Sequence, residues 1–477
     1  MQPLSHMYYI IQEMVLSKPV HKTSVLIVTT LPSFIIPFMG SSITIALPSI
    51  GEEFSMNAVL LGWVATAYLL AVAMFLVPFG RIADIHGRKT IYLWGLFIFT
   101  CSSLLAALST SPTQLILSRA LQGFGGSMIA GTGVAILSSV FEPGERGKAL
   151  GINVAATYSG LSLGPFLGGL LTQHLGWRSI FWLNVPLGAI MIGMVLWKLQ
   201  GEWAEARGER FDYAGSVIYG FTLLAMIYGL SLLPANFGVW LILIGILGMI
   251  VFIKYEATLQ SPVFNLSLFR DNKVFSFSNL AALINYSATF AVSFILSLYL
   301  QYTKGFPPEE AGMILVSQPI MQAIFSPFAG KLSDRIEPRI VASIGMGFTA
   351  LGLFLLIFLE EQTSVVFVIS TLVLLGFGFA FFSSPNTNAV MSSIDKRSYG
   401  VASATLATMR ATGMMFSMGL VMVIFAVTMG RVQMTPEYYP LFLKSAVTAF
   451  RVFTLLCVGG IFASLARGKV RQDISSH

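Results

Sequence analysis

The sequence predicts an all-α polytopic membrane protein with about fourteen transmembrane helices. Hydrophobic residues make up 55% of the 477 positions and charged residues only 10%, with a mean hydropathy of +0.79. Soluble domains carry about 25% charged residues, so this chain is too apolar for a water-exposed surface. Apolar runs of roughly 18 residues or more recur along nearly the whole length, each long enough to cross the hydrocarbon layer. Because lipid offers no partner to backbone N–H and C=O groups, these runs must be helical.

Polar breaks between the apolar runs give the expected order of the spans. Most breaks contain charged residues, glycine or proline, which are typical of turns. An even number of spans agrees with both chain ends lying on one side of the membrane. The expected spans are 24–48, 58–80, 91–109, 113–137, 148–172, 179–198, 213–233, 238–256, 275–300, 310–330, 340–359, 364–385, 400–429 and 447–466.

The net charge of +7 does not indicate a nucleic-acid partner, because the basic residues follow the membrane topology. If the turn at residues 80–89 is cytoplasmic, most of the 28 Lys and Arg residues fall in loops on that side. The loops on the other side hold only Arg178, Lys304, Arg431 and Lys444. This bias predicts a multi-pass protein of the plasma membrane with both termini in the cytoplasm. The first 22 residues show no cleaved signal peptide, so the first span is expected to direct insertion.

A short, charged, glycine-containing turn occurs twice in the chain. The stretch GRIADIHGRK spans residues 80–89, and GKLSDRIEPR spans residues 330–339; each lies between two apolar runs. This repeat predicts two related six-helix bundles with two helices inserted between them, an arrangement found mostly in transporters. The expected units are a cytoplasmic segment 1–23, a first bundle 24–198, a linker with two inserted helices 199–274, a second bundle 275–466 and a cytoplasmic tail 467–477.

Six motifs together resemble those of the major facilitator superfamily, and specifically its fourteen-span drug:proton antiporter branch. The resemblance covers nearly the whole chain and implies the major facilitator fold. Besides the turn at residues 80–89, the motifs are LSRALQGFGG (Leu117–Gly126), SGLSLGPFLGG (Ser159–Gly169), WVATAYLL from Trp63, GWRSIFWLNVPLG from Gly176 and ASATLATMRATG from Ala402.

The repeated turn is a candidate conformational latch. Asp84 sits at a helix end, where a carboxylate can face the positive N-terminus of a neighbouring helix. The resemblance implies that this neighbour is the span beginning near Gly400, and that the contact holds the halves in the outward-facing state. The alternative is a solvated loop that only fixes topology. The candidate residues are Gly80, Arg81, Asp84, Gly87, Arg88, Lys89 and Asp334.

Two arginines lie inside predicted spans. A guanidinium at membrane depth is costly unless it faces water or a partner, so Arg119 and Arg410 are candidate functional residues. Arg119, with Gln122 one turn on, is expected to bias the protonation of an acid or to attract an anion. Arg410 is expected to line the central cavity near the midplane. Structural, snorkelling arginines are the alternative.

The fifth span combines glycine with a proline. Pro165 removes a hydrogen-bond donor and kinks the helix, and small residues allow helices to approach closely. The resemblance implies that this motif marks exporters that exchange substrate for protons, with the helix at the interface between the halves. A kink that serves packing alone is the alternative. The residues are Gly160, Gly164, Pro165, Gly168 and Gly169.

Aromatic and amide side chains in the spans are candidates for a substrate cavity. Stacking faces mixed with hydrogen-bonding groups suit amphipathic small molecules. For any single residue, hydrogen bonding between helices is the competing explanation. The candidates are Trp63, Tyr68, Tyr158, Asn279, Asn285, Tyr286, Gln318, Gln322, Asn386 and Asn388.

One position departs from the antiporter pattern. The fourteen-span exporters commonly carry a membrane-buried Asp in the first span, and Met39 occupies its place here. No other Asp or Glu lies securely in mid-span, and no His lies in a span, so the titrating group that proton coupling needs is not evident. Two mid-span arginines without an acid favour an anionic or zwitterionic substrate instead.

These observations predict a secondary transporter that exports small organic or drug-like compounds by alternating access, by proton-coupled antiport. The alternative is an anion or metabolite porter without proton coupling. A membrane enzyme is disfavoured because no catalytic set is assembled within the spans. No motif predicts a cofactor, and Cys101 and Cys457 are too few for a metal site or disulfide framework. The expected partners are a small-molecule substrate, protons and the lipid bilayer, with the protein as a monomer.

Overall fold

The computed structural model describes residues 22–259, 264, 266–394 and 399–468. Among them, fourteen stretches of helix are long and apolar enough to cross a membrane, which confirms the predicted number. The first half contains α2 (Lys22–Glu53), α3 (Ala58–His86), α4 (Arg88–Ala107), α5 (Pro112–Val140), α6 (Pro143–Leu175) and α7 (Arg178–Lys198). Then come α8 (Tyr213–Leu232), α9 (Asn236–Glu256) and the short α10 (Leu266–Asp271). The second half contains α11 (Lys273–Leu298), η1 (Tyr299–Thr303), α12 (Pro308–Leu315), α13 (Ser317–Arg335), α14 (Pro338–Leu355), η2 (Leu356–Phe358), α15 (Val365–Ser392), α16 (Tyr399–Thr428), η4 (Pro436–Tyr438) and α17 (Tyr439–Ala466).

Polar residues at the helix ends show why the helices begin where they do. The side chains of Asn57, Ser111, Asp212, Asn272 and Ser364 each accept a hydrogen bond from a backbone N–H in the first turn of the next helix. Such caps satisfy donors that the helix itself leaves without a partner. Proline stands at the start of several other helices, where its missing N–H costs nothing.

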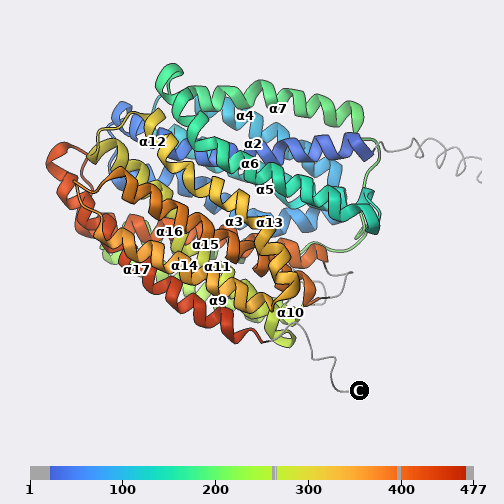
Figure 1. Ribbon diagram of the computed structural model, residues 1–477. Coiled ribbons are helices and arrows are strands. Elements are labelled where there is room, and N and C mark those ends of the chain that lie inside the picture. The colour runs from blue at the N-terminus through green and yellow to red at the C-terminus, as the bar shows by residue number, and fades with distance from the viewer. Residues whose placement is uncertain (1–21, 260–263, 265, 395–398, 469–477) are drawn as a thin grey trace, which may run out of the picture.

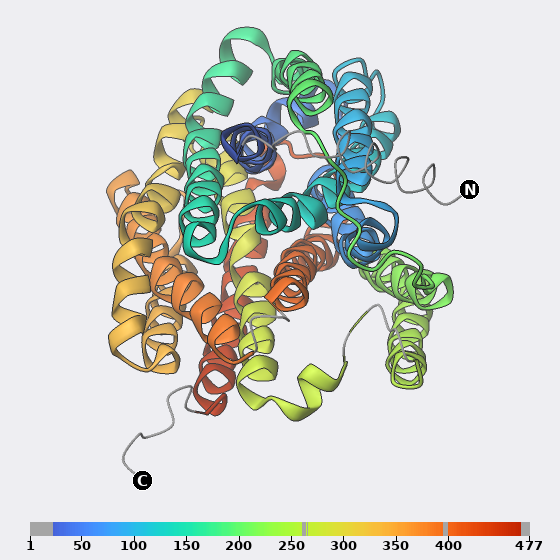
Figure 2. The ribbon, with the colours of Figure 1, turned by 90° about the vertical axis from the view of Figure 1, so that its right-hand side faces the viewer.

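The helices pack as two groups. In the first half, α2 packs on α6, while α5 packs on α3 and α4, and α4 also packs on α7. In the second half, α11 packs on α16 and α17, and α14 and α13 pack on α15. The inserted helices α8 and α9 pack on each other, and α8 touches both α3 and α16 (Figures 1 and 2). The inserted pair therefore borders both halves.

Both repeated turns lie at one end of the molecule, which we call the motif end. The far end is called the opposite end. In Figure 1 the ribbons of the two halves diverge toward the motif end, where the first and last described residues also lie. Because every span reverses direction, Gly87 and Ile336, which follow α3 and α13, fall at this same end. The second half departs from the expected spans in two places: the tenth span is interrupted at Val316, and the last begins at Pro436.

The two halves are held together at the opposite end. The Ser297 hydroxyl donates to the carbonyl of Thr44 at 2.8 Å, and the Gln301 amide donates to the carbonyl of Ile45 at 3.0 Å. Further out, a single antiparallel bridge pairs Asn57 with Gln433. Among the described residues, no hydrogen bond or ion pair joins the two halves at the motif end. The structure is thus closed at the opposite end and separated at the motif end.

Candidate functional site

The first loop motif is covered by the segment after α7, residues 199–212, which we call the strap. The amide of Arg88 donates to the carbonyl of Trp203 at 2.8 Å, and the amide of Ala206 donates to the carbonyl of Asp84 at 2.9 Å. Figure 2 shows this segment, in green, crossing the motif end of the first half on its way to α8. The strap therefore forms backbone contacts on both sides of the Gly87 turn.

Three glutamates of the strap bind the motif. Glu202 accepts the amides of Lys89 and Thr90 at 2.8 and 3.1 Å, which are first-turn donors of α4. Glu205 accepts two hydrogen bonds from Arg88, at 2.7 and 3.0 Å. Glu209 pairs with Arg81. Hydrogen bonding to Arg88 outweighs partial burial and lowers the pKa of the Glu205 carboxyl from its ordinary value.

Gly87 is required at this turn for two reasons. Its φ of 119° is one that residues with a side chain rarely adopt, and a Cβ there would overlap the carboxyl group of Glu202. In the second copy of the turn the equivalent position is Glu337, with φ of −48°. The two turns therefore share a sequence pattern but differ in backbone conformation.

Asp84 is bound locally in this conformation. Its carboxylate accepts from Nε of Arg88 at 2.8 Å, and Arg81 pairs with Glu209 and not with Asp84. No hydrogen bond or ion pair between described residues joins Asp84 to α16. The expected latch contact is therefore not made in this state, in which the motif end is separated. In the second turn, Asp334 accepts a hydrogen bond from Asn388 at 3.1 Å.

Arg119 lies inside the first half and not between the halves. Its side chain is 2% exposed, its Nε donates to the carbonyl of Val64 at 3.0 Å, and its Nη1 donates to Gln122. The guanidinium lies 4.6 Å from the centre of the Tyr68 ring. Three predicted cavity residues, Arg119, Gln122 and Tyr68, thus form one buried cluster, because α5 packs directly on α3.

Met39 belongs to the same cluster. The Gln122 amide donates to the Met39 sulfur at 3.0 Å and to the Ser103 hydroxyl at 2.7 Å. The described residues place no carboxylate in an ion pair with Arg119. The thioether of Met39, the residue expected in place of the antiporter acid, therefore lies one hydrogen-bonded side chain away from Arg119.

The glycines of α6 face two different neighbours. A Cβ on Gly160, Gly164 or Gly168 would clash with α2, at Phe34, Ser41 and Ser42 respectively, so this row packs within the first half. The helix lies at the interface between the halves as expected, but these three glycines do not, because they face the close α2–α6 crossing within the first half.

The other face of α6 does meet the second half. A Cβ on Gly169 would overlap the carbonyl of Pro308, and one on Gly312 would overlap the carbonyl of Pro165. At the end of this crossing, Nε2 of His174 lies 3.2 Å from Oε2 of Glu309. The α6–α12 crossing is therefore a close backbone-to-backbone seal at the opposite end.

Arg410 lies at the junction of the halves. Its Nη2 donates to the Thr387 hydroxyl at 2.6 Å, and its guanidinium carbon lies 5.7 Å from the centre of the Tyr286 ring. Beside this group, the hydroxyls of Tyr158 on α6 and Ser383 on α15 lie 3.5 Å apart. Arg410, Tyr286 and Tyr158 are thus brought together from three helices and from both halves.

The remaining predicted cavity residues have other surroundings. Trp63 packs on Tyr228 of inserted helix α8, with ring centres 6.1 Å apart. Asn285 is fully buried, and within the described part of the chain neither amide atom has a hydrogen-bond partner. Gln318 and Gln322 lie on α13, where Oε1 of Gln318 is buried without a partner and the Gln322 side chain is 7% exposed.

Of three predicted amides in the second half, Asn386 and Asn388 join different helices, and Asn279 bonds within its own helix. Asn386 accepts from the guanidinium of Arg467 at 3.0 Å, Asn279 donates to the carbonyl of Phe275 at 2.9 Å, and Asn388 binds Asp334. Arg467, expected in the cytoplasmic tail, is wholly buried at the end of α17. Sequence reasoning missed this residue because its position beyond the last apolar run resembled an ordinary basic flank.

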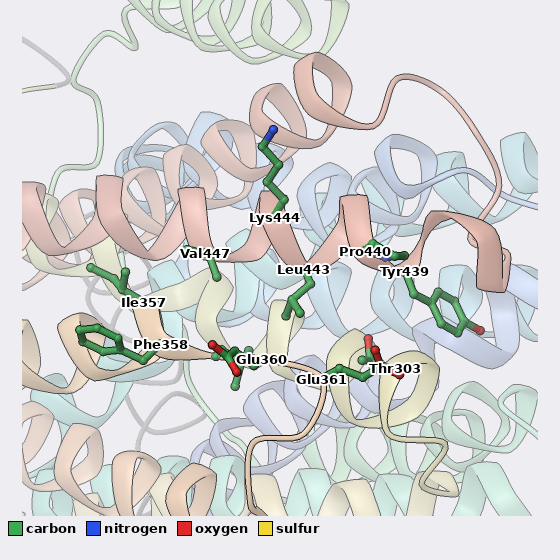
Figure 3. Close-up of a pocket in the computed structure, with 11 residues that line it drawn as sticks. Thr303, Ile357, Phe358, Glu360, Glu361, Tyr439, Pro440, Leu443, Lys444 and Val447 are labelled. Carbon is green, nitrogen blue, oxygen red and sulfur yellow. The ribbon is translucent and has the colours of Figure 1, made fainter.

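Sequence reasoning also missed the three strap glutamates. These glutamates lie at positions 202, 205 and 209, and the loop motif carries several basic residues. The two opposite charge patterns could have predicted that the two segments pair. A surface pocket of about 400 Å³ lies on the second half at its opposite end, lined by η1, η2, α17 and the segment after η2 (Figure 3). Lys444 points away from Glu360 and Glu361 there, and none of the predicted site residues lines it.

Among the described residues, no group of three or more His, Cys, Asp or Glu side chains is arranged to hold a metal ion. Cys101 and Cys457 are free thiols.

Comparison with known proteins identifies relatives along most of the chain. The family model of the Major Facilitator Superfamily matches residues 30–418 and 278–467. The riboflavin transporter RibZ of Clostridioides difficile is 32% identical over 82% of this chain and 85% of its own length. The multidrug resistance protein Stp of Mycobacterium tuberculosis is 30% identical over 81% of this chain and 73% of its own length. The cephamycin export protein CmcT of Amycolatopsis lactamdurans is 30% identical over 86% of each chain.

Solved structures share the fold at low sequence identity. A bacterial homologue of the human lysosomal transporter Spinster, in an inward-facing and unoccupied conformation, superposes with a TM-score of 0.66. It is 16% identical, and the match covers 96% of this chain and 100% of that one.

Proposed function

Since this chain is a transporter of the major facilitator superfamily, we propose that it exports small organic compounds by alternating access and exchanges them for protons. The observation that carries the proposal is the asymmetry of the contacts between the halves. They are closed by the α6–α12 seal and the Asn57–Gln433 bridge at one end, and separated at the other. A pair of repeated bundles with one sealed end is the arrangement that alternating access requires.

The basic loops support a cytoplasmic location for the motif end, in the plasma membrane. In that orientation, separation at the motif end supports an inward-facing state of the transport cycle. The outward-facing state would separate α6 from α12 and bring Asp84 toward the start of α16. The protein would act as a monomer, because one chain supplies both bundles. Transport of this kind would require neither a cofactor nor a catalytic step.

The relatives suggest the cargo. They include a riboflavin transporter, a cephamycin export protein and a puromycin resistance protein. A flat, partly polar compound of that kind is a reasonable first cargo to test here, because tyrosines from both halves meet at the junction beside Arg410.

Proton coupling requires a group that titrates during the transport cycle. The second candidate function, a porter of anions or metabolites without proton coupling, is favoured by Met39, which places a sulfur beside Gln122 where an acid would titrate. Asp84 and the His174–Glu309 pair are titratable groups at contacts that the proposed transport cycle would change, namely the loop motif and the α6–α12 seal.

Reconstitution in proteoliposomes tests both candidates. Riboflavin, a cephamycin and puromycin would be supplied as cargoes, with and without an imposed pH gradient. Proton antiport predicts that cargo moves up its gradient only while the pH gradient lasts, and that an uncoupler stops it. Cargo movement indifferent to the pH gradient would favour the uncoupled porter, and no movement of any cargo would oppose transport of these compounds.

A further inference from the structure

Arg410 carries a charge that the protein does not neutralise. The described residues place no carboxylate in an ion pair with it, and its own contacts are a hydroxyl of Thr387 and the face of the Tyr286 ring. Its Nε is buried and forms no hydrogen bond with any residue that the structure describes. A guanidinium at membrane depth is stabilised by an anion or by water, and it cannot lose its proton. Because the side chain is only partly buried and no described carboxylate offsets its charge, the guanidinium has the capacity to bind a negatively charged group from outside the chain.

The surroundings of Arg410 are aromatic. The Tyr286 ring packs edge to face on Phe379, with ring centres 5.2 Å apart, and Tyr286 is only 7% exposed. Tyr158 reaches this group from the other half. These aromatic side chains next to the guanidinium suit a flat molecule that carries an acidic substituent. The ring of that molecule would contact the tyrosines, and its acidic group would accept hydrogen bonds from Arg410.

The other buried arginine does not compete for the same ligand. Arg119 is 2% exposed, and both its Nε and its Nη1 already donate to groups of the first half. Arg410, in contrast, is only partly buried and lies where residues of both halves meet. An anion arriving between the halves would meet Arg410 first.

We propose that Arg410, with Tyr286 and Tyr158, forms a binding site for a flat aromatic anion, and that such compounds are the preferred cargo class. The cargo assignment rests on the proposed transport function, whereas the anion site can be tested by equilibrium binding alone. A cationic compound would be repelled by Arg410, since no carboxylate of the described residues stands beside it to offset the charge. A neutral analogue would keep the ring contact and lose the charge-assisted hydrogen bonds.

The test is equilibrium dialysis of the full-length protein in nanodiscs, with empty nanodiscs subtracted for lipid partitioning. The probes are naphthoate, naphthamide and naphthylmethylammonium, which share one ring system and differ in charge. The wild-type protein is expected to bind naphthoate at least about tenfold more tightly than the other two, because hydrogen bonds between charged partners are the strong class.

Variants locate the binding. Arg410→Gln should remove the preference for naphthoate, whereas Arg410→Lys should keep part of it, because the charge remains and the fork is lost. Arg451→Gln is the matched control, since Arg451 lies exposed on α17. Tyr286→Leu should weaken all three probes, and Tyr286→Phe should not. Size-exclusion profiles and melting temperatures would check that each variant folds.

The results separate this site from the transport proposal. Four results would each overturn the anion site. The protein could bind the three probes equally, prefer naphthylmethylammonium or bind none of them, or Arg410→Gln could keep the wild-type preference for naphthoate. In those cases, flux of a neutral or cationic cargo in the liposome assay would still support the proposed transport function. A naphthoate preference without any flux would sustain the site and oppose the transport proposal.

Discussion

At the scale of single residues, the two fully buried arginines are stabilised by neutral polar groups and an aromatic ring. Arg119 is bound by a carbonyl, an amide and a ring face, and Arg467 by Asn386 and by serines. Neither makes an ion pair with a described residue. Because breaking a network around a buried charge leaves that charge without compensation, these polar neighbours are expected to be sensitive positions.

Met39 offers a direct test of the Arg119 cluster. Met39→Asp places a carboxylate where the thioether now accepts from Gln122, one side chain away from Arg119. At neutral pH it should be more stable than Met39→Asn by on the order of 1 kcal/mol, because a Coulomb attraction of about 2–3 kcal/mol between unit charges several Å apart, at an effective dielectric near 20, is partly offset by the cost of burying the carboxylate. Thermal unfolding in detergent measures the difference. Equal stability of the two variants would mean that Arg119 does not sense position 39.

At the scale of elements, the strap couples the linker to the first loop motif. Glu202 binds the first turn of α4, Glu205 binds Arg88 and Glu209 binds Arg81. The Glu205 side chain is 67% exposed, so solvent screens its pair and the contribution is about 0–1 kcal/mol. The strap is therefore held by several weak contacts acting together.

Hydrogen exchange of the Ala206 amide, which donates to Asp84, reports strap docking. The triple variant Glu202→Gln, Glu205→Gln, Glu209→Gln should speed this exchange strongly, and Glu205→Gln alone by about fivefold or less, the equivalent of 1 kcal/mol. Glu361→Gln, an exposed glutamate at the opposite end, is the control. Exchange in the triple variant equal to the control would show that backbone contacts suffice.

The strap should also respond to pH. Hydrogen bonding to Arg88 lowers the folded-state pKa of Glu205, so its contribution is present above the ordinary carboxyl pKa and is lost as pH falls through the lowered value. After correction for intrinsic rates, exchange of the Ala206 amide should therefore be constant at neutral pH and rise only in acid. In Glu205→Gln this rise should be smaller.

The α6–α12 seal depends on two glycines. In Gly312→Ala the new methyl group would overlap the backbone carbonyl of Pro165, which cannot turn away, so α6 and α12 should move apart. Spin labels on the opposite ends of these helices should report a longer distance. Gly347→Ala is the matched control, because a Cβ there meets no atom within 4 Å. Unchanged distances in Gly312→Ala would mean that the crossing tolerates a methyl group.

At the scale of the whole molecule, the two halves share one closed end, and alternating access requires that end to open. The Asn57–Gln433 bridge brings those residues to the separation of paired strands, about 4.5–5.5 Å between Cα atoms, which suits a disulfide. The α8 helix packs on both α3 and α16, so the inserted pair must slide or follow when the halves rock.

A disulfide across the closed end tests the rocking motion. In Asn57→Cys with Gln433→Cys, oxidation should hold the opposite end shut and reduce cargo flux in proteoliposomes to background, and a reductant should restore it. The single-cysteine variants are controls for loss of the Asn57 cap and for the native thiols. Full flux through the oxidised double variant would exclude opening at this end as a step of transport.

By itself the sequence determined the fold class, the number of helices and their order, because hydrocarbon thickness and backbone hydrogen bonding leave few options for runs this apolar. It also located the repeated turn, Pro165 and Arg410, since charge, proline and glycine are local signals. Only the tertiary structure decided which neighbours these residues have. It turned Gly160 toward α2 and Gly169 toward α12, enclosed Arg119 within one half and paired the strap with the loop motif. Those outcomes depend on which faces of which helices meet, and no pattern along a single helix specifies that.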